Sequence, residues 1–156
     1  MSAPTAEAAV TEAEETFDEA LVAAYLQDRL AADTLDLVSF KRNVGGMSRE
    51  TWFAEVRGTR GAEPFTDSLT LRVDHPGGSV VPVDLEREYR TFAALTPTQV
   101  PVAAALWFET DAALTGRAPF YVRRTVPGSA SAGRLFKPGN EELRRAIGAD
   151  LARQLA

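Results

Sequence analysis

The sequence predicts an α+β fold in which helices pack on a five-stranded, mainly antiparallel sheet. Strand-like sequence bounded by turn residues occurs five times, over residues 35–40, 51–56, 68–73, 102–110 and 118–125. Apolar residues recur at helical spacing in three segments, 16–32, 84–95 and 140–156. The first three strand segments follow one another with only turn-rich sequence between them. Sequential strands with short connections favour an antiparallel meander with a helix packed on it.

The composition is that of an ordinary globular chain of about one domain. The chain has 156 residues, a net charge of −5, no cysteine and one histidine, His75. This excludes a disulfide scaffold, thiolate metal ligation, a cysteine nucleophile and a multi-histidine metal site. The sequence has no run of about 18 apolar residues that could span a membrane, and its start does not resemble a signal peptide. We therefore expect a cytoplasmic protein.

Charge is distributed unevenly along the chain. Nine of the 22 acidic residues lie within residues 1–36, which contain a single base, Arg29. Such an acidic segment argues against binding to nucleic acid or to an anionic membrane, because it would repel phosphates. Residues 1–15 also lack apolar periodicity, and we expect them to form a flexible acidic tail.

The first helix is predicted over residues 16–32. Thr16 and Glu19 have the spacing of a capping box, and the apolar residues that follow share one helical face: Leu21, Val22, Tyr25, Leu26 and Leu30. Three breaks separate the next elements: a glycine turn over 43–48, a turn-rich segment over 58–67 and the His-Pro-Gly-Gly sequence at 75–78.

The second helix is predicted to start after Asp84 as its cap, and its apolar stripe is Leu85, Tyr89, Phe92 and Leu95. Glu88 lies along this stripe, where a carboxylate is costly unless it is paired. After a loop over 129–139, the last helix starts at an Asn140 cap and reaches residue 156 with its apolar stripe intact. A helix that ends only where the chain ends suggests that these residues are a fragment.

Three features together suggest a site for phosphate chemistry. The glycine turn can bring backbone N–H groups close to a phosphate. Arg72 lies with Thr70 on the polar face of the third strand, and Glu88 on the following helix is an available partner for Arg72. Each feature also has an ordinary interpretation: a simple turn, an arginine on a solvated face, and a glutamate that reaches water. Combined, they form the upper half of a kinase-type site.

These segments resemble the aminoglycoside phosphotransferase and choline kinase-like group, within the protein kinase-like fold. Gly45-Gly-Met-Ser-Arg-Glu-Thr51 resembles the glycine loop of that group, and Leu69-Thr-Leu-Arg72 resembles its third strand. The helix over 84–95 places Glu88 at the position of the orienting acid. Val100-Pro-Val102 resembles the lead into the fourth strand, and 114–122 with Val126-Pro-Gly128 resembles the stretch through the hinge.

The resemblance implies a nucleotide-binding role for nine residues: Gly45, Gly46, Met47, Ser48, Thr70, Arg72, Glu88, Arg123 and Thr125. The glycine loop would cradle the phosphates, Arg72 would contact the α- and β-phosphates, and Glu88 would orient Arg72. Thr70 and the hinge would line the adenine pocket. Arg124 stands where the family usually has glutamate, so recognition of the base would rely on backbone groups near Arg123 and Thr125.

On this interpretation residues 16–128 are a kinase-like N-terminal lobe, and 129–156 are a linker and first helix leading to a C-terminal lobe that is missing here. The expected nucleotide is ATP or GTP. The catalytic residues, the magnesium ligands and the site for a small-molecule hydroxyl acceptor are expected in the missing lobe. We therefore predict part of a phosphotransferase that is inactive by itself.

Two alternatives remain open at this stage. The first is a non-catalytic pseudokinase or a nucleotide-binding or interaction module of the same fold, which Arg72 and Arg124 keep open. The second is that these 156 residues are a complete protein. Its exposed lobe interface would then be an apolar patch, and we expect such a protein to self-associate.

Overall fold

The computed structural model describes residues 16–43, 49–75, 84–128 and 132–155. Its elements follow in the order α1 (Glu19–Arg29), β1 (Thr34–Arg42), β2 (Arg49–Arg60), β3 (Glu63–Asp74), α2 (Leu85–Leu95), β4 (Ala105–Glu109), the 3-10 turn η1 (Ala112–Leu114), β5 (Phe120–Arg124), α3 (Ala132–Leu135) and α4 (Glu141–Leu155). The predicted α+β class is confirmed. The predicted tail over 1–15 and residues 44–48 of the glycine turn predicted over 43–48 lie outside the described residues.

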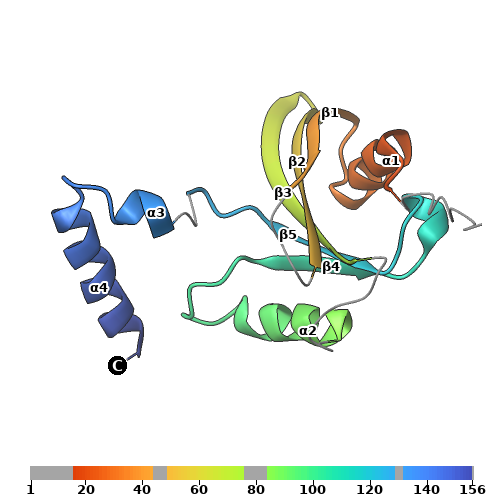
Figure 1. The fold of residues 1–156 in the computed structure, drawn as a ribbon. Helices are drawn as coiled ribbons and strands as arrows, with labels where there is room; N and C mark the ends of the chain where they lie inside the picture. Colours follow the sequence, from red (N-terminus) through yellow and green to blue (C-terminus); the bar gives the residue numbers. More distant parts are fainter. Residues whose placement is uncertain (1–15, 44–48, 76–83, 129–131, 156) are drawn as a thin grey trace, which may run out of the picture.

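The five strands form one sheet in the order β1-β2-β3-β5-β4, and every neighbouring pair is antiparallel. The first three strands are the predicted meander. α1 lies against one face of the sheet, and α2 lies beneath β4 and β5 on the other (Figure 1). The strand order makes β3 the middle strand, and one helix lies on each face of the sheet.

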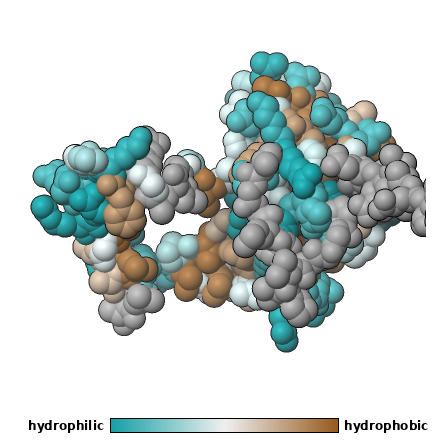
Figure 2. All heavy atoms as spheres, in the orientation of Figure 1, coloured by the Kyte–Doolittle hydropathy of each residue, from teal (hydrophilic) through white to brown (hydrophobic). Residues whose placement is uncertain are grey.

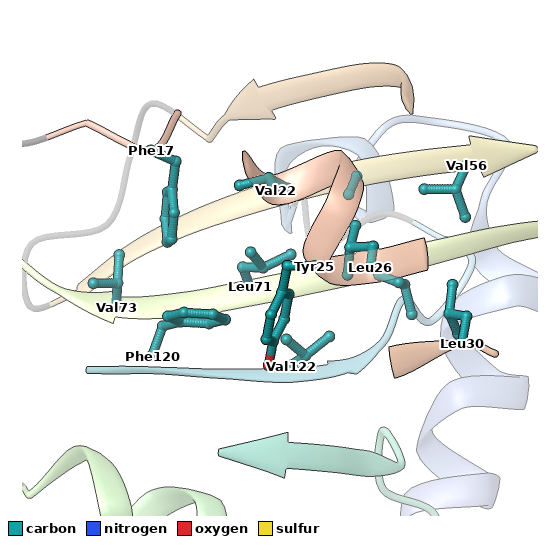
Figure 3. Packing of buried hydrophobic residues seen from close by; sticks show 12 residues of the cluster. Phe17, Val22, Tyr25, Leu26, Leu30, Val56, Leu71, Val73, Phe120 and Val122 are labelled. Atoms are coloured by element: carbon teal, nitrogen blue, oxygen red, sulfur yellow. The ribbon is translucent and has the colours of Figure 1, made fainter. Parts of the chain in front are cut away.

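The hydrophobic core lies between α1 and the sheet (Figure 3). Val22, Tyr25 and Leu26 of α1 are buried, and they face Leu71 of β3 and Val122 of β5, which are also buried. Because side chains alternate along a strand, the same strands present a second set of residues to α2. The functional residues predicted on β3 belong to that second set.

The predicted capping box of the first helix is wrong. The helix begins at Glu19, and the carboxylate of Asp18 accepts hydrogen bonds from the N–H groups of Ala20 and Leu21 at 2.9 and 3.1 Å. Phe17 is buried instead of forming part of the first turn, and its ring packs edge-to-face on that of Phe120 at 5.4 Å. Burial of this ring fixes where the helix can start.

The segment predicted as turn-rich, 58–67, is a tight hairpin. The strand β2 continues to Arg60 and β3 begins at Glu63, so the turn contains only Gly61 and Ala62. Gly61 has φ of +59°, which glycine adopts without steric cost. The prediction of a turn-rich segment over 58–67 is wrong, because most of these residues lie within two long paired strands.

The C-terminal part also differs from the prediction in one place. The segment predicted as a loop, 129–139, contains the short helix α3, whereas α4 begins one residue after the predicted Asn140 cap. The stripe of α4 is exposed at Leu143, Ile147 and Leu151. Figure 2 shows hydrophobic residues on both sides of the open space between the α3–α4 segment and the sheet. None of the described helices is long and apolar enough to cross a membrane.

Candidate functional site

The strand β3 presents Thr70 and Arg72 to the face of the sheet that α2 covers. Leu69, Leu71 and Val73 point to the opposite face and are buried in the core. The predicted period of two is confirmed, and it follows from the alternation of side chains in a pleated strand.

The helix α2 brings Glu88 to this face. Asp84 caps the helix by accepting a hydrogen bond from the N–H of Glu86 at 3.0 Å, as predicted. Arg72 contacts Glu88 Oε1 through Nη2 at 3.2 Å and donates to it through Nε at 3.3 Å. The predicted pairing of the two residues is therefore confirmed. The Glu88 side chain is 20% exposed, so it reaches water in part, but its carboxylate is ion-paired and is not held by water alone.

Three further residues contact this pair, and sequence reasoning missed all of them. Arg49 Nε lies 3.2 Å from Glu88 Oε2, and the hydroxyl of Tyr121 donates to Glu88 Oε1 at 2.6 Å. Arg72 Nη1 donates to the hydroxyl of Thr51 at 2.9 Å. Thr51 and Tyr121 stand directly opposite Arg72 on the neighbouring strands. The register of β2 against β3 places Thr51, and the register of β5 against β3 places Tyr121, but the sequence gives neither register.

Tyr121 stays protonated at neutral pH. Burial, together with the hydrogen bond to Glu88 and the negative charge of that residue, raises the pKa of Tyr121 to about 12. The phenol therefore acts as a donor to Glu88, and the carboxylate of Glu88 receives a hydrogen bond in addition to its two ion pairs.

An open hollow of about 670 Å³ lies at the end of β5, beside this cluster. Thr70, Arg123 and Thr125 are among its lining residues, so the structure brings together these three predicted site residues. The hydroxyls of Thr70 and Thr125 are 2.8 Å apart, and the Arg123 guanidinium lies over the ring of Phe92 at 5.3 Å from its centroid. The hollow thus combines hydroxyl groups, an arginine and apolar surface.

Two backbone donors at the predicted hinge are already used. The N–H of Thr125 donates to Ser68 O, and the N–H of Arg124 donates to Ala104 O, both at 2.9 Å. The side chain of Arg124, the residue that departs from the family pattern, forms an ion pair with Asp67. Arg124 is therefore held by an acid of β3 although it also borders the hollow.

A second hollow, of about 550 Å³, runs along the exposed side of α2. Its lining includes Glu86 and Arg90, which form a surface ion pair at 2.6 Å. It is separate from the contacts of Arg72 and Glu88, and we assign it no chemistry. Within the described part of the chain, no group of three or more His, Cys, Asp or Glu side chains could hold a metal ion.

The sequence profile of the phosphotransferase enzyme family matches residues 39–156, which is most of the chain. The chain belongs to this family. The match begins in β1 and includes the strands and the helix that carry Arg72 and Glu88.

This member of the phosphotransferase enzyme family is also similar to a solved structure. A crystal structure of a protein from Ralstonia eutropha JMP134, provisionally described as an aminoglycoside phosphotransferase, shares 27% sequence identity with a TM-score of 0.51. The similarity covers 74% of this chain but 30% of that one. A comparison with curated proteins finds no match. The kinase-like N-terminal lobe predicted from the sequence is confirmed, and the chain spans less than a third of the solved relative.

Proposed function

We propose that this chain is the nucleotide-binding lobe of an ATP- or GTP-dependent phosphotransferase that acts on the hydroxyl group of a small molecule. The observation that carries the proposal is the ion pair of Arg72 and Glu88, formed between the middle strand and α2 beside an open hollow. Kinase-type sites use such a pair to present a cation to the nucleotide phosphates.

Arg72 has the properties that a phosphate contact requires. Its side chain is 23% exposed, so it is accessible to a ligand, while Glu88 and Thr51 fix its orientation. A guanidinium keeps its charge and offers a planar fork of donors that matches phosphate oxygens. Arg72 would contact the α- and β-phosphates, and Glu88 would act through Arg72 as a positioning residue.

The hollow is the proposed position of the purine base. Ligand pockets combine apolar walls with a few polar groups that fix orientation. Thr70 and Thr125 supply hydroxyls that donate or accept, and Phe53 and Phe92 supply apolar surface. Because the N–H groups of Arg124 and Thr125 are engaged in the sheet, these hydroxyls and the Arg123 side chain would contribute most to recognition of the base.

The remaining parts of the proposed site lie elsewhere. Gly45, Gly46, Met47 and Ser48 would contact the phosphates through backbone N–H groups. The described residues hold no acidic cluster that fits Mg²⁺. On the family resemblance, the metal ligands and the groups that position the acceptor alcohol would belong to a second lobe outside these 156 residues.

The proposal is tested by nucleotide binding to the native polypeptide that carries these residues. ATP and GTP are titrated with and without Mg²⁺, and binding is followed by thermal shift and calorimetry. Arg72→Ala should weaken binding by about 1–3 kcal/mol, the size of hydrogen bonds to charged groups. Arg90→Ala is the matched control, because Arg90 is an exposed arginine that pairs with Glu86 on the outer side of α2.

The outcomes separate the proposal from its alternative. Absence of binding to either nucleotide, or unchanged binding by Arg72→Ala, would contradict the proposed site. Binding without transfer of the γ-phosphoryl group to any alcohol would favour a non-catalytic nucleotide-binding module.

A further inference from the structure

Arg49, the first residue of β2, is a buried cation outside the predicted site. Its side chain is 3% exposed. An arginine cannot lose its proton in a protein, and a buried charge is unfavourable unless it is paired. Arg49 Nη1 lies 3.3 Å from Asp74 Oδ1, and Arg49 Nε lies 3.2 Å from Glu88 Oε2. Arg49 therefore joins the start of β2, the end of β3 and the helix α2.

The two oxygens of Glu88 have different partners. Oε1 receives the guanidinium of Arg72 and the hydroxyl of Tyr121, whereas Oε2 faces Arg49. The carboxylate is thus held by one cation on each oxygen. If either arginine is removed, Glu88 still has the other.

The two arginines differ in their access to a ligand. Arg72 has 23% of its side chain exposed, and Arg49 has 3%. A phosphate at this site could be contacted by Arg72 but not by Arg49. The phosphate would compete with Glu88 for Arg72, because both anions need the same guanidinium.

We infer that Arg49 is a positioning residue that neutralises Glu88 and holds it in place, and so allows Arg72 to engage a phosphate. Without Arg49, Glu88 and Asp74 would lose their buried cation, and Glu88 would bind Arg72 more tightly. The competing attraction would then lower the affinity of the site for a nucleotide. This inference rests on the proposed function, since it requires Arg72 to contact the phosphates.

The test is a double-mutant cycle on ATP binding to the native polypeptide, measured by calorimetry. Arg49→Met should raise the Kd for ATP about tenfold, in the range expected for a charged hydrogen bond. In the Arg72→Ala background the same substitution should change Kd by less than about twofold, because the effect of Arg49 acts through Arg72. Arg57→Met is the matched control: Arg57 lies on the same strand in an exposed pair with Asp36, and its loss should leave Kd unchanged.

A merely structural role for Arg49 gives a different result. It predicts losses from Arg49→Met and Arg72→Ala that add in free energy, and additivity would overturn the inference. Unchanged binding by Arg49→Met, with weakened binding by Arg72→Ala, would overturn the inference but leave the proposed function intact. If the wild-type protein binds neither ATP nor GTP, the inference and the proposed function are both contradicted.

If the Arg49→Met variant does not fold, Arg49→Lys replaces it in the same double-mutant cycle. A lysine keeps the charge but lacks the fork that reaches both acids, so Kd should rise only about threefold. The rise should disappear in the Arg72→Ala background, and a rise that persists there would overturn the inference. Circular dichroism of each variant confirms that the protein compared is folded.

Discussion

Arg72 of β3 and Glu88 of α2 form an ion pair, with Nη2 and Oε1 3.2 Å apart, that ties the helix to the middle strand of the sheet. Tyr121 of β5 and Arg49 of β2 contact the same carboxylate. Glu88 therefore connects three strands to α2. A residue with this many charged and polar partners should matter for stability as well as for the proposed nucleotide binding.

Replacing Glu88 by Gln should lower the free energy of unfolding by about 2 kcal/mol. Removal of one partner from a fully buried ion pair costs about 3–5 kcal/mol, and the partial exposure of Glu88 and Arg72 reduces that cost. Urea unfolding measures the change. Glu86→Gln is the control, because Glu86 pairs with the exposed Arg90 and its loss should cost at most about 0.5 kcal/mol. Equal effects of the two substitutions would show that Glu88 is not held as described.

Replacing Arg117 by Met should destabilise the chain by about 3 kcal/mol or more, because it leaves the buried carboxylate of Glu50 without its closest cation. Arg117 Nη1 donates to Glu50 Oε2 at 2.7 Å, and both side chains are almost fully buried. Arg117 also donates to Asp74 O at 2.8 Å. Thermal unfolding tests the prediction against the exposed control Arg57→Met. A melting temperature close to that of the control would contradict it.

The ion pair of Arg72 and Glu88 could be predicted because two local rules are enough to orient both residues. Alternation along the strand places Arg72 opposite Leu71, and helical spacing places Glu88 beside Leu85 and Phe92. Neither rule needs to know which strands are neighbours. The partner Tyr121 does depend on it, because β3 pairs with β5 after an intervening helix and strand. Arg49 lies on β2, and its contact with Glu88 depends on how α2 packs against the start of that strand.

Two predictions are wrong for a common physical reason: the capping box next to Phe17 and the turn-rich segment that starts at Gly58. Capping and turn preferences are local, but a large apolar side chain or a close backbone approach can override them. Phe17 is buried against Phe120, which lies far away in the sequence. Gly58 allows β1 to approach β2 instead of marking a turn. Neither contact can be predicted from the local sequence, because each joins residues that are far apart along the chain.

Replacing Gly58 by Ala should destabilise the sheet by about 2–3 kcal/mol, the range for overpacking a buried site. An added Cβ would lie 2.1 Å from Thr34 O, which is backbone and can move only if β1 moves. Urea unfolding gives the change in stability. Gly148→Ala is the control, because nothing lies within 4 Å of its added Cβ and alanine favours an exposed helix by up to about 1 kcal/mol. A neutral Gly58→Ala would contradict the close approach of the two strands.

The ion pair of Glu50 should make stability depend on acid pH. Burial opposes ionisation, but hydrogen bonds from Arg117 and Trp52 and the charges of Arg117 and Arg42 lower the pKa of Glu50 below its usual 4.5. A lowered pKa in the folded state stabilises the fold above about pH 4.5, and this contribution disappears as the pH falls through the folded-state pKa. The difference in unfolding free energy between wild type and Glu50→Gln should therefore be largest at neutral pH and shrink below about pH 4.5. His75 lies 4.0 Å from Glu50, so the comparison is repeated with His75→Gln in both proteins, which leaves Glu50 as the difference between them. A difference that stays constant from pH 7 to pH 3 would show that ionised Glu50 does not stabilise the fold.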